Sequence, residues 1–397
     1  MRSLRIILVL SEAPLPFGHA VGRWYYVLLR GLVERGHRVC CFAICNDDCQ
    51  AAEARRLFPA ASFDLRLYEY PVRSRLWQKW QTLRRPFSYM IDPRLQRDVQ
   101  AECRQGFDVL HLEGIWSGWL GRGCDPAKVV LNFHSLYDID QELSPAQGWR
   151  ERTLRMLRRK AEHRLLRSSG TLLTLTPRLA REVRSIAPHT PVHVVPLGMD
   201  LSLYPYVPTK RRVAEPVVSV IGSMNWYPSY SAAVRLLTRL APAIRARLPQ
   251  TQVHIVGWGA RQALRPYLSQ PATLIAESVP DTRPYFESAG VFLYAPERGS
   301  GMKVKVMEAF AYGIPVVTTS EGIEGIPAQD GIHVGCCDED GGLVQRTVTL
   351  LTDHSRQERQ RGAARELLHQ HCRPEVVLEA LQACYADMAA RQRRQVA

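Results

Sequence analysis

RIILVLSEAPLPFGHAVGRWYYVLLRGLVERGHRVCCFAI, residues 5–44, decides the fold of the first half of the chain. The stretch begins with an apolar run at 5–10, turns through PLPFG and ends with a second apolar run at 38–44. Gly36 closes the helix expected between them. The apolar residues of that helix recur at the spacing of one helix face: Tyr25, Leu28, Leu29, Leu32. Two apolar strands joined by an amphipathic helix predict a unit of parallel sheet.

The same alternation of apolar runs and helix-length stretches continues along the chain. The expected strands are 5–10, 38–44, 64–70, 109–114, 128–134, 171–176, 192–198, 217–223, 252–257, 273–279, 290–296, 315–320 and 331–335. Strands this apolar are typical of parallel sheets covered on both faces. Residues 199–216, rich in proline and charge, separate two sets of strands. We therefore predict an α/β protein with Rossmann-like, doubly wound domains at 1–205 and 206–375, and a helix at 376–397 that packs back on the first domain.

Composition excludes several classes of protein. The 397 residues are 46% hydrophobic and 23% charged, which is ordinary for a globular enzyme and excludes a disordered tail or a collagen. No apolar run approaches the roughly 20 residues that span a bilayer. The ten cysteines form no CxxC pair, so we expect a reducing, cytoplasmic environment.

The net charge of +14 points to phosphate-bearing partners. Two basic stretches lie in the first half of the chain, Val72–Met90 with Trp77 and Trp80, and Arg150–Arg167. A basic amphipathic helix with tryptophan is typical of attachment to an anionic membrane surface. The alternative is a helix packed on its own sheet with a solvated basic side. The basic residues match no nucleic-acid module, so we expect no nucleic-acid partner.

The segment from Pro296 to Ile326 carries the clearest chemistry. A strand runs into Gly299-Ser300-Gly301, which opens a helix holding Lys305 and Glu308. Free N–H groups and the positive dipole end at a helix start favour an anion such as a diphosphate. Lys305 could neutralise a phosphate while Glu308 accepts hydrogen bonds from ribose hydroxyls. The alternative is an ordinary ion pair on a solvated helix.

This segment resembles the nucleotide-sugar signature of family 4 retaining glycosyltransferases, which have the GT-B fold of two facing Rossmann-like domains with a cleft between them. The resemblance implies that the donor diphosphate binds the loop and helix start, with Lys305 compensating its charge and Glu308 binding the ribose. The implied loop residues are Gly299, Ser300, Gly301 and Met302. Many members carry a glutamate where this chain has Ser300, so the donor-sugar contacts differ here.

Other parts of the second half fit the same resemblance. Residues 217–229 are similar to the first strand and loop of a donor domain, where Gly222 and Ser223 would approach the phosphates. Asp281 lies in a loop implied to contact the nucleobase, and its alternative role is to cap the next turn. Glu324 closes the family pattern.

The first half resembles the family more loosely. Gly18 matches a glycine loop implied to face the donor phosphates, and His134 matches a histidine that touches the transferred sugar in relatives. The alternative for His134 is a structural role, and Glu113 is a weaker candidate of the same kind. His19 stands where inverting GT-B enzymes place a general base, which keeps an inverting mechanism open.

The resemblance implies a retaining glycosyltransferase, and with the basic stretches we expect it to be of cell-surface polysaccharide or lipopolysaccharide type. It would move a sugar from a UDP- or GDP-sugar to a growing glycan or lipid-linked acceptor at the cytoplasmic face of the membrane. We expect no metal and no cofactor, because no Asp-x-Asp motif lies in the relevant loops. A catalytically silent GT-B subunit that binds nucleotide or a partner, and a sugar-nucleotide epimerase, remain alternatives.

Overall fold

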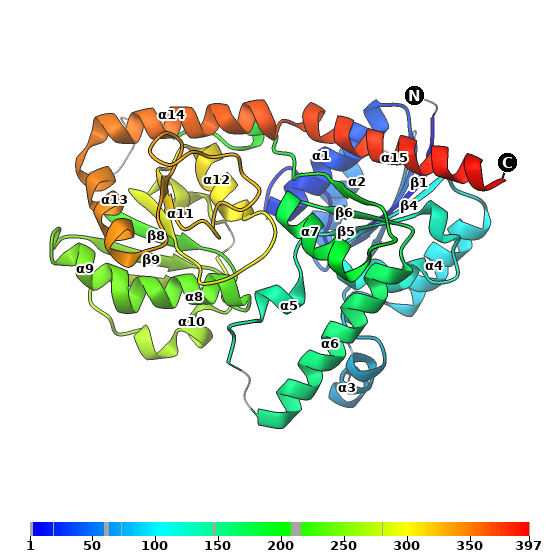
Figure 1. The fold of residues 1–397 in the computed structure, drawn as a ribbon, viewed down its shortest axis with the longest axis horizontal. Coiled ribbons are helices and arrows are strands. Elements are labelled where there is room, and N and C mark those ends of the chain that lie inside the picture. Colours follow the sequence, from blue (N-terminus) through cyan, green and yellow to red (C-terminus); the bar gives the residue numbers. More distant parts are fainter. Residues whose placement is uncertain are drawn as a thin grey trace. The chain divides into compact units, whose positions relative to one another are not determined.

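The structure is a computed structural model that describes residues 3–18, 20–58, 63–72, 74–145, 148–207, 216–279 and 281–396. The chain forms two compact units (Figure 1). Unit 1 comprises Met1–Asp138, Pro145–Met199 and Pro374–Ala397, and unit 2 comprises Ile139–Ser144 and Asp200–Arg373. The predicted first domain, 1–205, includes Ile139–Ser144, whereas the structure groups this short segment with unit 2. Residues 208–215 of the expected linker lie outside the described residues.

Unit 1 is built on a parallel sheet of seven strands in the order β3-β2-β1-β4-β5-β6-β7. β1 pairs in parallel with both β2 and β4, so the strand order reverses between β1 and β4. In open α/β sheets ligands bind beyond the carboxyl ends of the strands at such a reversal. The strands are β1 (Arg5–Leu10), β2 (Arg38–Ile44), β3 (Phe63–Tyr68), β4 (Val109–Glu113), β5 (Val129–Phe133), β6 (Thr171–Thr174) and β7 (Val192–Val194).

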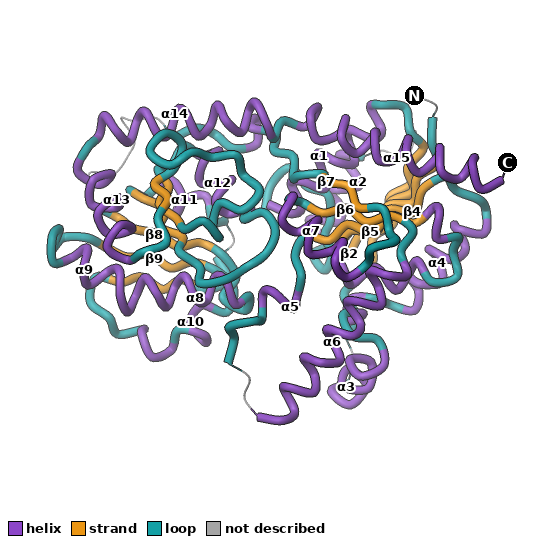
Figure 2. Tube along the Cα trace, viewed as in Figure 1, coloured by secondary structure: helices purple, strands orange, loops and turns teal. Residues whose placement is uncertain are grey.

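Helices cover both faces of this sheet, as the purple and orange segments of Figure 2 show. In α1 (Ala20–Glu34) the predicted apolar face is buried. The other helices of unit 1 are α2 (Asp48–Leu57), α3 (Arg75–Arg84), η1 (Ser88–Met90), α4 (Pro93–Arg104), η2 (Ile115–Gly121), η3 (Pro126–Lys128), α5 (Tyr137–Asp140, shared with unit 2), α6 (Gly148–Ser168), α7 (Pro177–Ile186) and α15 (Pro374–Val396). α15 packs on α1, where Gly31 leaves room for the side chain of Leu378.

Unit 2 repeats the plan with six parallel strands in the order β10-β9-β8-β11-β12-β13, which reverses between β8 and β11. The strands are β8 (Val217–Ile221), β9 (Gln252–Val256), β10 (Thr273–Ala276), β11 (Val291–Tyr294), β12 (Val316–Thr318) and β13 (Gly335–Cys336). The helices are η4 (Leu201–Leu203), α8 (Tyr227–Arg235), η6 (Leu236–Leu240), α9 (Ala241–Arg245), α10 (Ala260–Ala263), η7 (Arg265–Tyr267), α11 (Arg283–Glu287), α12 (Val304–Tyr312), α13 (Asp340–Thr352) and α14 (His354–His371).

The expected strands are present with small shifts at their ends, and the last one differs most. The sequence predicts a strand at 331–335, whereas β13 begins at Gly335. The reason is a turn in which Gly331 adopts a φ of 78° and donates its N–H to the carbonyl of Val334. Within the described ranges, no helix is both long enough and apolar enough to span a membrane.

Candidate functional site

The predicted loop Gly299-Ser300-Gly301 joins β11 to α12 in unit 2 and follows the carboxyl end of β11, beside the strand-order reversal. Ser300 is buried, and Gly301 has a φ of 72°, a left-handed conformation that favours glycine. A side chain at position 299 would crowd Pro228, whose Cγ would lie 3.1 Å from the added Cβ. The loop is therefore closely packed, and its sequence is restricted by backbone geometry.

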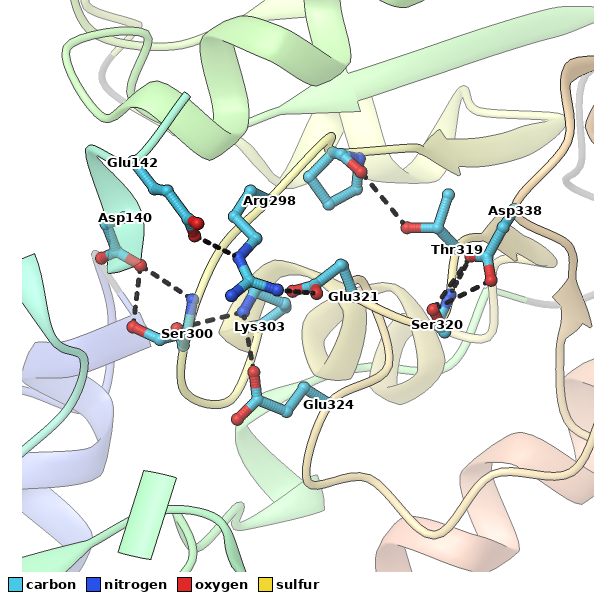
Figure 3. Close-up of polar contacts among 11 residues, drawn as sticks. Asp140, Glu142, Arg298, Ser300, Lys303, Thr319, Ser320, Glu321, Glu324 and Asp338 are labelled. Atoms are coloured by element: carbon cyan, nitrogen blue, oxygen red, sulfur yellow. Dashed lines mark hydrogen bonds and ion pairs between the residues drawn. The ribbon is translucent and has the colours of Figure 1, made fainter. Parts of the chain in front are cut away.

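The carboxylate of Asp140 holds this loop. One oxygen accepts hydrogen bonds from the backbone N–H and the hydroxyl of Ser300, both at 2.8 Å (Figure 3). The other oxygen accepts from Nε1 of Trp226 at 2.9 Å. Asp140 is only 3% exposed, so these donors replace its contacts with water. The sequence suggests no role for Asp140, because its partner Ser300 lies 160 residues away.

Lys303 fixes the same loop from the other side. Its ammonium donates to the carbonyl of Ser300 at 3.0 Å and lies 3.8 Å from Oε2 of Glu324 (Figure 3). It also donates to the carbonyl of Gly301 at 2.7 Å. The side chain of Lys303 is fully buried. A buried charge is tolerated when it is paired and hydrogen-bonded, and Lys303 meets both conditions. The sequence analysis gave Lys303 no role and named Glu324 only as the end of the motif.

Lys305, two residues further on, is held differently. Its ammonium donates to the hydroxyl of Ser229 and lies 4.6 Å from the ring centre of Trp226 and 4.8 Å from that of Tyr294. Burial and, after it, the charge of Lys303 lower the pKa of Lys305 to about 7, against the opposing charges of Glu308 and Asp140. Near neutral pH a bound anion would therefore strongly favour the protonated form.

Several other predicted donor residues lie around Lys305 or near the loop in unit 2. Gly222 follows β8, and a Cβ at this position would lie 2.8 Å from Nζ of Lys305, so a side chain here would displace the Lys305 ammonium. Ser223 is the next residue in the chain. Met302 is buried and directly precedes Lys303 in the sequence. Glu308 lies three positions after Lys305 on α12 and is partly buried.

Asp281 has the contact expected of its alternative role. Its Oδ1 accepts a hydrogen bond from the backbone N–H of Arg283 at 2.9 Å, where α11 begins. The nucleobase contact implied by the resemblance stays a prediction.

His134 and Glu113 form a second cluster, in unit 1. Glu113 ends β4, His134 follows the neighbouring β5, and Nε2 of His134 lies 2.6 Å from Oε2 of the buried Glu113. Asn132 donates to both oxygens of Glu113 at 3.2 Å, and Nε2 of His111 lies 3.0 Å from Oε1. The other nitrogen of His111 is 2.6 Å from the hydroxyl of Tyr385 on α15.

Glu113 stays ionised in this cluster. Burial would raise the pKa of Glu113, but the hydrogen bonds with His111 and His134 outweigh it and hold the pKa well below its usual range. A buried carboxylate that holds one ring nitrogen fixes the orientation of a histidine, as in many catalytic sites. The sequence analysis named both His134 and Glu113, and the structure brings them together.

Two other predictions concern the loop after β1. Gly18 has a φ of 80°, a conformation that favours glycine. His19, the candidate general base of an inverting mechanism, lies outside the described residues. Across the described part of the chain, no group of three or more His, Cys, Asp or Glu side chains could hold a metal ion.

Sequence comparison assigns both halves of the chain to one class of enzyme. Residues 21–203 match the family described as Glycosyltransferase Family 4, and residues 215–353 match that described as Glycosyl transferases group 1. The chain belongs to glycosyltransferase family 4. No curated protein sequence matches it. The glycine loop, Lys305 and Glu308 all lie in the segment matched to Glycosyl transferases group 1.

Solved structures share the GT-B fold of this glycosyltransferase over nearly its whole length. Sucrose-phosphate synthase from Thermosynechococcus elongatus is 16% identical with a TM-score of 0.67, over 99% of this chain and 100% of that chain. HepE of Anabaena, solved with UDP and glucose, is 13% identical with a TM-score of 0.65, over 97% and 100%. WaaG, a glycosyltransferase of lipopolysaccharide biosynthesis, is 14% identical with a TM-score of 0.61, over 95% and 98%.

Replacing Asp140 tests its role in holding the loop. Asp140→Ala leaves the N–H and hydroxyl of Ser300 and the indole N–H of Trp226 without their acceptor, which should lower the free energy of unfolding of unit 2 by about 1–3 kcal/mol. Denaturant unfolding followed by tryptophan fluorescence measures this change. Asp138→Ala is the control, because Asp138 is 43% exposed and pairs with Arg159 at the surface, so its loss should cost less than about 1 kcal/mol. Equal effects of the two variants would contradict the assignment.

Proposed function

We propose that this glycosyltransferase retains the configuration of the transferred sugar and uses a UDP- or GDP-sugar without a metal ion. The observation that carries the proposal is the partly buried ammonium of Lys305, whose pKa is lowered to about 7 beside the loop that opens α12. Such a group is poised to bind the phosphate that leaves with the nucleotide. HepE, with a similar fold, was solved with UDP and glucose, which supports this donor class.

In the proposed mechanism the chain stabilises the leaving diphosphate with fixed charges. Lys305 neutralises the β-phosphate, and the N–H groups at the start of α12 face the negative charge that develops in the transition state. Glu308 accepts hydrogen bonds from the ribose hydroxyls. The acceptor oxygen attacks the anomeric carbon on the face from which the phosphate leaves, and that phosphate takes the acceptor proton. His134, oriented by Glu113, contacts the transferred sugar.

The acceptor proposed here is a growing glycan or a lipid-linked sugar of cell-surface polysaccharide or lipopolysaccharide type. WaaG, whose fold is similar, acts in lipopolysaccharide biosynthesis, which supports this class of acceptor.

We further propose that the protein attaches peripherally to the inner face of the cell membrane. Three apolar residues of α3 are more than half exposed: Leu76, Trp80 and Leu83. The guanidinium of Arg84 lies 5.0 Å from the ring centre of Trp80, so charge and apolar surface adjoin as at an interfacial helix.

The stereochemistry of turnover tests the mechanism. The purified protein is incubated with UDP-glucose or GDP-mannose, and proton NMR of the anomeric region follows the first sugar product before it mutarotates. Retention gives a product with the anomeric configuration of the donor. The opposite anomer would replace the retaining mechanism with an inverting one, and conversion of the donor into its epimer would identify an epimerase. Absence of any turnover, with or without nucleotide binding, would indicate a silent subunit.

Nucleotide binding should depend on pH through Lys305. A bound diphosphate favours the ammonium, so binding raises the pKa of Lys305 above the value of about 7 in the free protein. Above that pH, binding takes up a proton, and the affinity for UDP or GDP should fall by up to about tenfold per pH unit. Calorimetry from pH 6 to 9, in buffers of different ionisation enthalpy, measures both the affinity and the proton uptake.

Lys305→Arg is the matched variant for this titration, because arginine keeps its charge throughout the range and should abolish the proton uptake. Unchanged uptake in Lys305→Arg would assign the titration to another group.

Flotation with phosphatidylglycerol vesicles tests membrane attachment. Trp80→Ala should reduce the bound fraction several-fold, because it removes apolar surface from the proposed anchor. Trp258→Ala is the control, since Trp258 is a 69% exposed tryptophan of unit 2. Binding should weaken as salt is raised. An unmodified protein that stays with the soluble fraction at low salt would refute the attachment.

A further inference from the structure

The two basic stretches that the sequence singles out meet at one cavity of unit 1. Its volume is about 370 Å³, and it lies between the segment around α3 and η1 and the segment that contains α5 and α6, whose helices are labelled in Figure 1. Arg85 enters its lining from the stretch 72–90 and Arg158 from the stretch 150–167. The nucleotide proposal uses neither residue. The cavity therefore needs an explanation of its own.

Arg158 of this cavity differs from the neighbouring arginines of α6, which form ion pairs with carboxylates. On α6, Arg159 lies 3.0 Å from a carboxylate oxygen of Asp138, and Arg155 lies 3.1 Å from one of Glu151. Arg158 instead donates to the neutral hydroxyl of Tyr137 at 2.8 Å, with its guanidinium 5.3 Å from the ring centre of Tyr137. In the described ranges no carboxylate is paired with Arg158.

Positive charge accumulates near Arg85 as well. Partial burial lowers the pKa of Arg122, and the charges of Arg164 and Arg85 lower it too, so both of these cations repel the guanidinium of Arg122. An anion between such groups would relieve this repulsion. Arg85 is exposed, so its guanidinium is accessible to a ligand from solution.

Aromatic rings and hydrogen-bonding groups complete the lining. The ring centres of Tyr70 and Tyr89 are 6.3 Å apart, and those of Phe87 and Tyr137 are 5.6 Å apart in an edge-to-face arrangement. Phe87 has a φ of 71°, a left-handed conformation that is strained for a residue with a side chain. Trp119 helps to hold this turn, because its Nε1 donates to the carbonyl of Pro86 at 2.7 Å. Backbone strain of this kind is typical of binding sites.

We propose that this cavity binds one anionic sugar unit, phosphorylated or carboxylated, of the acceptor. The guanidinium groups of Arg85 and Arg158 bind the anion, since the planar fork of arginine matches a phosphate or carboxylate. The aromatic rings contact the apolar face of the sugar. The volume lies at the lower end of the range for small-molecule sites, so it suits one charged sugar rather than a long oligosaccharide. The description of this ligand as the acceptor rests on the proposed function, whereas the binding itself does not.

The anionic sugar can come from a soluble glycan or from the head group of a glycolipid. A second cavity of about 260 Å³ shares Gln81, Arg85 and Ser88 with the first and is lined by Trp77 and Trp80. A lipid-linked sugar could therefore place its charge on the arginines and its apolar part near the tryptophans. A glycolipid is presented by a membrane, whereas a soluble glycan is not. The test therefore compares binding to vesicles with binding of soluble sugars.

The test measures binding of glucose 6-phosphate, glucuronate and glucose by calorimetry, with and without saturating UDP. Glucose 6-phosphate and glucuronate should bind at least tenfold more tightly than neutral glucose. Arg158→Gln and Arg85→Gln should each weaken glucose 6-phosphate binding at least tenfold. Arg159→Gln is the matched control, because it removes the same charge one residue away on α6 and should leave the affinity unchanged. Tyr89→Ala provides an independent variant should Arg158→Gln prove unstable in thermal denaturation.

The outcomes separate this proposal from the proposed function. Equal affinities of Arg158→Gln and Arg159→Gln for glucose 6-phosphate would overturn it. If Arg158→Gln loses both glucose 6-phosphate binding and binding to phosphatidylglycerol vesicles, the anion is presented by a lipid head group. If Arg158→Gln loses glucose 6-phosphate binding while its vesicle binding is unchanged, the anion belongs to a soluble glycan. If UDP does not bind but glucose 6-phosphate binding still requires Arg158, the nucleotide proposal fails and the cavity stands.

Discussion

Two ammonium groups, the buried Lys303 and the partly buried Lys305, are the constraint around which the candidate site of unit 2 is arranged. Like charges close together and shielded from water destabilise a fold unless each finds partners. Lys303 finds them in two loop carbonyls and Glu324, so its charge is used to fix the loop. Lys305 has a hydroxyl and two aromatic faces, which satisfy it only in part, and its pKa falls accordingly. The same pair of residues thus supplies one rigid support and one group available to a ligand.

Unit 1 likewise contains one charged group with a full set of polar partners, Glu113, and one without a carboxylate partner among the described residues, Arg158. Glu113 is surrounded by His111, Asn132 and His134, which explains how a carboxylate stays ionised at the end of a buried strand. Arg158 lies among arginines that have carboxylate partners but itself contacts a phenol. Charges with complete sets of partners hold structure, and charges with incomplete sets are the ones at which we propose that ligands bind.

The sequence predicts what depends on neighbouring residues and fails where distant residues meet. The strands β1 and β2 begin and end as predicted because each is a continuous apolar run bounded by a turn. Lys305 and Glu308 could be named because they share a motif with the glycine loop. The partnership of Asp140 with Ser300 and the convergence of Arg85 with Arg158 could not, since no local pattern reports contacts across such separations. The strand predicted at 331–335 failed for another reason, a glycine turn whose geometry outweighs an apolar run.

The position of α15 in unit 1 affects the order in which the two units fold during synthesis. Its residues Leu378 and Tyr385 complete the core of unit 1, against Gly31 and His111, although they follow all of unit 2 in the chain. Domains made first on the ribosome generally fold first. Here the first unit to emerge must wait for a segment translated after the second unit. Unit 2 can therefore reach its final packing while unit 1 is still incomplete, and a nascent chain that stalls before Pro374 would carry an unfinished unit 1 beside a finished unit 2.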